Sequence, residues 1–401
     1  MGLRTWVKRR FGKKEVQPMT AIEMAEQWFN SGIQKYMQGD MEGTIQHLDK
    51  AIKLKSDYHE AWCGRGISLS DLGRYQEAIA SFDKAIEFKP DFHEAWYNCG
   101  ISLEALGRCE EAIAFYNKAI EFKPDFHEAW NNRGGLLSDL GRYQEAIAAF
   151  DKAIEFKPDF HEAWNNRGGL LSALGRYEEA IAAFDKAIEF KPDYHEAWYN
   201  CGISLEALGR YEEAIASYNK AIEFKPDYHK AWYNRGISLE ALGRYEEAIA
   251  SYNKAIQFKP DDHEAWNNRG ISLCELGRKE EAIVSFDKAI QFKPDDHAAW
   301  SNRGIPLAAL GRYEEAIASH DKAIEFKPDY HEAWNNRGGS LSALGRKEEA
   351  IASYDQAIEF KPDYHEAWYN RGISMEALGR NGEAIVSFDK AIQFNPDNNS
   401  V

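Results

Sequence analysis

Hydrophobic and polar positions follow one pattern that repeats every 34 residues along most of the chain. In residues 93–126, apolar and small side chains recur three and four positions apart in two stretches, and this spacing is typical of one face of an amphipathic helix. The first stretch contains Trp96, Gly100, Leu103 and Leu106, and the second contains Ala112, Ile113, Tyr116, Ala119, Ile120 and Phe122. Gly107 separates the two stretches and Pro124 follows the second, which predicts two helices joined by a tight turn.

A tryptophan marks the repeat most clearly, because it returns in register eleven times. The positions are Trp28, Trp62, Trp96, Trp130, Trp164, Trp198, Trp232, Trp266, Trp300, Trp334 and Trp368. A fixed period of this length predicts stacked two-helix repeats that contact only their neighbours. We therefore expect an all-α fold of eleven antiparallel helix-turn-helix repeats over residues 25–398. Gly100 is expected to be small because the two helices of a repeat approach closely there.

Each repeat is expected to begin with an Asp-x-x-Glu capping box, in which the aspartate accepts hydrogen bonds from free backbone amides and the glutamate reaches back. The pairs are Asp91/Glu94, Asp125/Glu128, Asp159/Glu162 and Asp193/Glu196. Both carboxylates would also lie at the positive end of the helix dipole, where negative charge is stabilising.

The repeat resembles the tetratricopeptide repeat. The residues that carry the resemblance are Trp62, Arg65, Gly66 and Leu69 in the first half, and Ala78, Phe82, Ala85 and Pro90 in the second. The resemblance implies a right-handed α-solenoid superhelix made of repeats alone. Arginine (Arg65, Arg133, Arg167, Arg235) often stands at position seven, where the family usually has leucine. We expect its stem to pack on the tryptophan indole and its guanidinium to reach solvent or a carboxylate. Anion binding by this arginine is the alternative.

Three segments depart from the regular repeat. Residues 1–24 form a basic arm, expected to be flexible, and residues 399–401 are a short tail. The first repeat, 25–58, has polar residues where its neighbours have leucine, which is typical of a terminal cap. The ninth repeat, 297–330, carries Pro306 inside a helix and His320 in place of an aromatic residue, and we expect a kink or local weak point near Pro306.

Composition excludes several kinds of function. The formal net charge of −16 disfavours nucleic acid as a partner. The five cysteines show no CxxC pairing, which indicates free thiols and a cytoplasmic location. The sequence contains no run long and apolar enough for a membrane span. The histidine before each Glu-Ala-Trp recurs only once per repeat, too far apart to share a metal ion, so no metal and no cofactor are expected.

The polar face of the first helices offers a candidate peptide-binding groove. Asparagine occupies position six in ten of the eleven repeats, and the predicted groove residues are Asn98, Asn132, Asn166, Asn200, Asn234, Asn268, Asn302, Asn336 and Asn370. An asparagine amide can both donate to and accept from a peptide backbone. The row resembles the asparagine ladder in the tetratricopeptide part of O-GlcNAc transferase. The alternative is that each asparagine bonds within or between neighbouring repeats.

Flanking positions of the same face set its charge. The predicted groove also contains Glu94, Glu128, Glu162 and Glu196 at position two, and Tyr97, Tyr199, Tyr233 and Tyr369 at position five. Position twelve adds Glu104, Glu206, Glu240 and Glu376. An acidic, tyrosine-dotted groove should prefer basic or neutral segments. The alternative for the glutamates at position two is that they serve only to cap helices.

These features predict a non-catalytic scaffold that binds extended peptide segments or partner helices in this groove. The alternative is a targeting or regulatory adaptor, whose basic arm docks to an anionic membrane or an enzyme while the repeats recruit clients; residues 1–14 would make the weak membrane contact. Self-association through the last repeat is a further expectation, because no additional helix covers it. We expect no enzymatic activity, because no cluster of residues interrupts the repeat to form a catalytic site.

Overall fold

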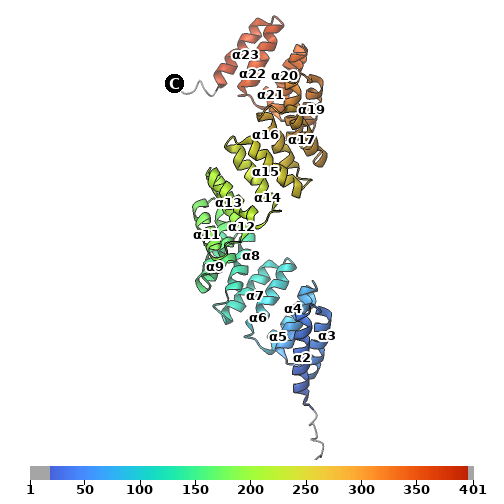
Figure 1. Cartoon of the computed structure of the whole chain (residues 1–401), viewed down its shortest axis with the longest axis vertical. Helices are drawn as coiled ribbons and strands as arrows, with labels where there is room; N and C mark the ends of the chain where they lie inside the picture. The colour runs from blue at the N-terminus through green and yellow to red at the C-terminus, as the bar shows by residue number, and fades with distance from the viewer. Residues whose placement is uncertain (1–18, 396–401) are drawn as a thin grey trace, which may run out of the picture. The chain divides into compact units, whose positions relative to one another are not determined.

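The computed structural model describes residues 19–395, and this range contains helices and no strands. Residues 1–18, which include most of the predicted basic arm, and the tail 399–401 lie outside the described residues. The chain divides into two compact parts, residues 1–190 and 191–401. Consecutive helices pack in pairs, from α2 with α3 to α22 with α23, so the predicted all-α helix-pair fold is confirmed (Figure 1).

The helix bounds repeat with the period of the sequence. Residues 19–190 contain α2(Ala21–Met37), α3(Met41–Leu54), α4(His59–Asp71), α5(Tyr75–Phe88), α6(His93–Ala105), α7(Cys109–Phe122), α8(His127–Asp139), α9(Tyr143–Phe156), α10(His161–Ala173) and α11(Tyr177–Phe190). Residues 191–395 contain α12(His195–Ala207), α13(Tyr211–Phe224), α14(His229–Ala241), α15(Tyr245–Phe258), α16(His263–Glu275), α17(Lys279–Phe292), α18(His297–Ala309), α19(Tyr313–Phe326), α20(His331–Ala343), α21(Lys347–Phe360), α22(His365–Ala377) and α23(Asn381–Phe394).

Glycine ends the first helix of each repeat, as predicted. Gly107 has a φ of 72°, a left-handed conformation that costs glycine little. The amide of Arg108 then donates to the carbonyl of Leu103 at 2.9 Å and that of Gly107 to Glu104 at 2.8 Å, which satisfies the last carbonyls of α6. The chain reverses within these few residues, and α7 begins at Cys109.

A second glycine lets the two helices of a repeat come together. A Cβ atom on Gly100 would lie 2.6 Å from Cε1 of the Tyr116 ring, which is too close for any other residue without movement. Tyr116 is completely buried at this crossing. The predicted role of Gly100 as a point of close approach is confirmed.

The predicted capping boxes are wrong. In the repeat that begins at His127, the residue at the N-cap is Phe126, one position after Asp125, and it makes no side-chain cap hydrogen bond. The Phe126 ring packs against Tyr97 of α6, with ring centroids 4.8 Å apart. Packing of the aromatic ring therefore fixes the start of the helix, and Glu128 instead contacts the adjacent His127 at 3.2 Å.

The same shift applies to the other predicted boxes, whose N-cap residues are Phe92, Phe160 and Tyr194. Two later repeats have an aspartate in place of the aromatic residue. There Asp262 accepts from the amide of Ala265, and Asp296 accepts from the amides of Ala298 and Ala299. A true capping box forms at the start of α2 between Thr20 and Glu23, which the sequence analysis did not identify.

The helix that contains Pro306 keeps the length of its counterparts. α18 runs for thirteen residues, as does each first helix from α4 onward, so Pro306 does not end it. The carbonyl of Pro306 accepts from the amide of Leu310 at 3.0 Å. The expected local weakness of this repeat stays a prediction.

Candidate peptide-binding surface

The predicted groove residues lie on the first helices of successive repeats, and we call the side chains at positions two, five and six of these helices the asparagine face. Most of its asparagines bond to the preceding repeat. Asn132 donates from Nδ2 to Tyr97 Oη at 3.1 Å, and Asn166 donates to Asn131 Oδ1 at 3.0 Å. In the second part of the chain the corresponding pairs are Asn234 to Tyr199, Asn268 to Tyr233, Asn302 to Asn267 and Asn370 to Asn335, at 3.1–3.2 Å.

Position five is therefore the partner of position six in the next repeat. Tyrosine and asparagine both occur at position five, and each presents an oxygen that accepts from the amide. Burial raises the pKa of Tyr97 to about 12, so its hydroxyl stays protonated and keeps a hydrogen of its own. The sequence analysis left this inter-repeat bond open as an alternative, and the structure places it in both parts of the chain.

Three predicted asparagines have other surroundings. Asn98 donates to the carbonyl of Glu94 in its own helix at 2.7 Å, because the residue at position five before it is Cys63 rather than tyrosine or asparagine. Asn336 lines a cavity with Asn370. Asn200 lies on α12, at the start of the second part of the chain.

Each bridging asparagine keeps further hydrogen-bonding capacity. A primary amide has two N–H donors and one carbonyl acceptor, and the bond to the preceding repeat uses one donor. For Asn132 and Asn268 the carbonyl also accepts from the asparagine just before it, at 3.3 Å. Three of the amides also interact with the buried tyrosine at position twenty-four of the preceding repeat: Asn132 with Tyr116, Asn234 with Tyr218 and Asn268 with Tyr252. The capacity left for a ligand therefore lies mainly at the amide carbonyl, which has two lone pairs. The bonds between repeats thus hold the amides in a fixed orientation without using all of their capacity.

The carboxylates of the asparagine face remain about half exposed. Glu94, Glu128, Glu162 and Glu196 each contact the histidine that precedes them in the same helix, at 3.0–3.2 Å. Their side chains are 42–47% exposed, so the negative charge reaches the solvent. Among the tyrosines, Tyr369 is the most exposed at 54%, whereas Tyr97, Tyr199 and Tyr233 are half-buried.

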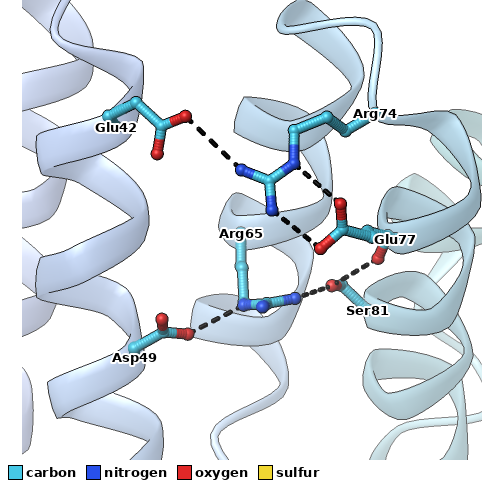
Figure 2. A network of polar contacts seen from close by, with 6 residues as sticks. All are labelled: Glu42, Asp49, Arg65, Arg74, Glu77 and Ser81. Atoms are coloured by element: carbon cyan, nitrogen blue, oxygen red, sulfur yellow. Dashed lines mark hydrogen bonds and ion pairs between the residues drawn. The ribbon is translucent and has the colours of Figure 1, made fainter.

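A separate polar network joins the repeats through the arginine at position seven. Figure 2 shows Arg65 reaching from α4 to two neighbouring helices: its Nε donates to Asp49 of the preceding repeat at 2.8 Å, and its Nη1 donates to Ser81 at 2.6 Å. Arg74 holds Glu77 with two bonds of 2.8 and 2.7 Å and approaches Glu42 of the preceding repeat at 3.4 Å.

The prediction that this arginine packs on tryptophan and reaches a carboxylate is confirmed in several repeats. The Arg371 guanidinium lies 5.8 Å from the centre of the Trp368 ring and donates to Asp355 at 2.6 Å. Because an internal carboxylate holds the guanidinium, the arrangement disfavours the alternative of anion binding. Other repeats differ: Arg235 and Arg269 donate to Asn219 and Asn253 instead of a carboxylate, and Nε of Arg133 is buried without a hydrogen-bond partner.

The comparisons with known proteins identify the family. The tetratricopeptide repeat model matches residues 32–91, 63–125, 120–159, 131–195, 170–229, 199–263 and 233–297. Two further models of the same repeat match residues 307–345 and 340–379, and residues 365–398. This chain belongs to the tetratricopeptide repeat family. As a tetratricopeptide repeat protein, it is a scaffold for protein–protein interaction.

Solved structures of other tetratricopeptide repeat proteins resemble this one. YrrB, described as having an unusual peptide-binding site, is 29% identical, with 47% of this chain and 96% of YrrB covered and a TM-score of 0.43. The Cut9–Hcn1 hetero-tetramer of APC/C gives 13% identity, coverage of 94% and 95%, and a TM-score of 0.47. A tetratricopeptide repeat protein from Parabacteroides merdae is 19% identical, with 62% of this chain and 98% of that protein covered and a TM-score of 0.45. No curated protein matches the sequence.

The glutamate at position twelve of a tetratricopeptide repeat here has an internal role that the sequence analysis missed. Glu240 accepts from Tyr252 of its own repeat at 3.1 Å and from Ser272 of the next repeat at 2.8 Å. Glu206 accepts in the same way from Tyr218 and Ser238, and burial raises the pKa of its carboxyl. A glutamate at position twelve with a tyrosine at position twenty-four is the sequence signal for this arrangement.

The described repeats contain few groups suited to nucleophilic chemistry or metal binding. All five cysteines are free, as predicted, and burial raises the pKa of the Cys63 thiol to about 12, which makes it a poor nucleophile. Within residues 19–395, no group of three or more histidine, cysteine, aspartate or glutamate side chains could hold a metal ion. The helices of the same range are all too short or too polar to cross a membrane.

Proposed function

We propose that this tetratricopeptide repeat protein is a non-catalytic scaffold that binds extended peptide segments, or partner helices, along the asparagine face. The observation that carries the proposal is the repeated bond from asparagine to the preceding repeat, as in Asn268 to Tyr233 at 3.1 Å. This bond supports the proposal because it fixes the asparagine amide in each repeat where it forms. A row of fixed amides at one spacing matches the regular polar groups of a peptide backbone.

The energetics require several repeats to act together. A hydrogen bond contributes about 1 kcal/mol net, whereas micromolar affinity needs about 8 kcal/mol. Because side chains of near-identical repeats offer the same contacts, affinity would come from the number of repeats engaged more than from the choice of side chain. The asparagine face therefore suits long or repetitive segments.

Charge determines which segments are preferred. The half-exposed carboxylates of Glu94, Glu128, Glu162 and Glu196 favour a basic or neutral segment over an acidic one. We place the protein in the cytoplasm, because a reducing compartment keeps its five free thiols reduced.

A peptide display library provides the test. The library presents random extended segments to the full chain, and selected peptides are measured by fluorescence anisotropy against a variant with Asn234, Asn268 and Asn302 changed to alanine. Loss of three hydrogen bonds of about 1 kcal/mol each should weaken binding roughly 100-fold. Unchanged affinity would refute peptide binding by the asparagines of the asparagine face.

Two control variants separate binding from folding. Changing Lys220, Lys254 and Lys288 to alanine alters exposed side chains of the second helices that pair only within their own helix, and it should leave affinity unchanged. Changing Tyr199 and Tyr233 to phenylalanine removes the partners of Asn234 and Asn268 but keeps their amides. This second variant frees the amides that the tyrosines hold, so it should lose stability and lose less affinity than the triple alanine variant.

The basic arm supports an alternative, a targeting adaptor that docks to an anionic membrane while the repeats recruit clients. Its sequence contains Arg4, Lys8, Arg9, Arg10, Lys13 and Lys14. Sedimentation with phosphatidylserine vesicles, with and without residues 1–18, tests it. Co-sedimentation of the full chain but not of the truncated variant would favour the adaptor. Recovery of both proteins in the supernatant would exclude membrane docking by the arm and leave the scaffold as the only proposal.

A further inference from the structure

A cavity lined by the ninth, tenth and eleventh repeats lies where other repeats place an internal carboxylate. The cavity has a volume of about 250 Å³, and its lining includes Ala308, His320, Asn336 and Ser340. Ala308 occupies position twelve, where the seventh repeat has Glu240, and His320 occupies position twenty-four, where the seventh repeat has Tyr252. Both substitutions remove atoms from the same place. Gly339 on the facing helix adds no side chain, and open space surrounds the position of its absent Cβ.

His320 is the polar group left without a partner by these substitutions. Its side chain is completely buried, with 0% of its surface exposed, and neither Nδ1 nor Nε2 has a hydrogen-bond partner. Buried nitrogens without partners are destabilising, and they are rare in folded proteins. The ring packs directly over Gly304 and lines the cavity, so it adjoins the space that a ligand would fill.

Ser340 supplies a second donor to the same space. It corresponds to Ser272, which donates to Glu240 at 2.8 Å, and to Ser238, which donates to Glu206 at 2.7 Å. Without a glutamate at position twelve before it, Ser340 donates to the carbonyl of Asn336 in its own helix at 3.1 Å. The serine at this position therefore turns to a carboxylate where one is present and to its own helix where none is.

We propose that this cavity binds a carboxylate from outside the chain, in the place that the Glu240 carboxylate occupies in the seventh repeat. The hydroxyl of Ser340 and one ring N–H of His320 would donate to it, as Ser272 and Tyr252 donate to Glu240. The adjacent amides of Asn336 and Asn370 add donors at the rim. The carboxylate can come from an acidic side chain of a bound segment or from a small free acid. The site shares Asn336 and Asn370 with the asparagine face, but its two principal donors, Ser340 and His320, lie outside that face.

Local charge is consistent with this ligand. Burial, together with the nearby Arg337, lowers the pKa of His320 to about 4, so the ring is neutral at pH 7 and offers one N–H. Arg337 itself is held by Asp321 at 2.6 Å and by Ser353 at 2.7 Å. The ligand thus meets neutral donors here, and its negative charge should raise the pKa of His320.

Nuclear magnetic resonance of the full chain with labelled histidine tests the proposal. The His320 signal is assigned by its loss in His320→Phe, and sodium propionate is titrated at constant ionic strength against the neutral propionamide. Propionate should give a saturable shift of the His320 ring signals, with a dissociation constant on the order of 10 mM for so small a ligand. Absence of a saturable shift, or an equal response to propionamide, would overturn the proposal.

Two variants connect the response to the cavity. Ala308→Glu restores the glutamate found in the seventh repeat, so its own carboxylate should occupy the cavity and abolish the response to propionate. Ser340→Ala removes one donor and should weaken propionate binding about tenfold. Circular dichroism verifies that both variants are folded. A full response in a folded Ala308→Glu would contradict the assignment.

Two blocked peptides distinguish the sources of the carboxylate. Competition with propionate by acetyl-Ala-Glu-Ala-amide indicates an acidic side chain of a bound segment. Propionate binding without competition by this peptide indicates a small free acid, and both outcomes support a carboxylate site. Equal competition by acetyl-Ala-Gln-Ala-amide would overturn it. Because this test reads the His320 ring and not peptide affinity, failure here leaves the proposed function untouched.

Discussion

Arg65 donates a hydrogen bond from Nε to Asp49 Oδ1 at 2.8 Å, and Asp49 belongs to the preceding repeat. The same arginine bonds to Ser81 in its own repeat, so one side chain joins three helices. The family usually has leucine at this position, which can only pack. Contacts between neighbouring repeats are a main source of stability in repeat proteins. Here directional hydrogen bonds from the arginine add to the apolar packing of that interface.

The fourth repeat lacks part of this bridge, and restoring it should stabilise the chain. Arg133 has Ala149 where Arg65 has Ser81, so its Nη1 lacks the serine acceptor that Arg65 Nη1 has. Ala149→Ser should supply an acceptor to Nη1 and stabilise this repeat by about 1 kcal/mol. Backbone hydrogen exchange in α8 and α9 measures the change. The same substitution in an Arg133→Leu background should give no gain; an equal gain would show that the serine acts without the arginine.

Two glycines should respond in opposite ways to alanine. In Gly100→Ala the new Cβ would lie 2.6 Å from the buried Tyr116 ring, so the third repeat should lose about 1–3 kcal/mol. Gly135 is also inside a helix, but nothing lies within 4 Å of its Cβ position. Gly135→Ala should therefore stabilise by about 0.5–1 kcal/mol. Thermal unfolding followed by circular dichroism compares the two, and a shift of the same sign in both would contradict this account.

The buried His320 should make the ninth repeat sensitive to acid. Its pKa is lowered to about 4 in the folded chain and rises to its ordinary value of 6.5 on unfolding. The unfolded state therefore binds more protons between these values, and stability falls as the pH falls from 6.5 to 4. The full effect is about 3 kcal/mol.

The variant His320→Tyr provides the reference for this pH dependence. Tyrosine is the residue of the sixth and seventh repeats at this position, and it does not titrate in acid. Hydrogen exchange in α18 and α19 at pH 7 and pH 4.5 should show a larger loss of protection in the wild type than in the variant. An equal loss in both would show that other groups cause the acid sensitivity.

The repeat fold could be predicted from the sequence because a single 34-residue pattern specifies both helices and their turn. As predicted, Gly107 ends the first helix of its repeat, and Gly100 lets the two helices approach closely. The capping boxes could not be placed correctly, because packing of Phe126 against Tyr97 of α6 decides where the next helix begins. Contacts between helices outweigh local capping preferences at these sites.

The candidate binding residues were found by their period, but their partners were not. The bond from Asn132 to Tyr97 spans two repeats, and the partner residue at position five is tyrosine in some repeats and asparagine in others, which share only an accepting oxygen. The unusual ninth repeat was also visible in the sequence. Its cavity was not visible, because it forms where three helices carry smaller residues than their counterparts. Ala308 stands in place of glutamate, His320 in place of tyrosine, and Gly339 has no side chain.

The central claim is that the asparagine face recognises peptide backbone. The most direct measurement is the affinity of a selected peptide after N-methylation of alternate backbone amides, compared with alanine substitution of its side chains one at a time. The account predicts that N-methylation of three backbone amides weakens binding roughly 100-fold, since each lost hydrogen bond removes about 1 kcal/mol, and that each alanine changes affinity less than about threefold. Retained affinity after N-methylation, with large losses at single side chains, would contradict it.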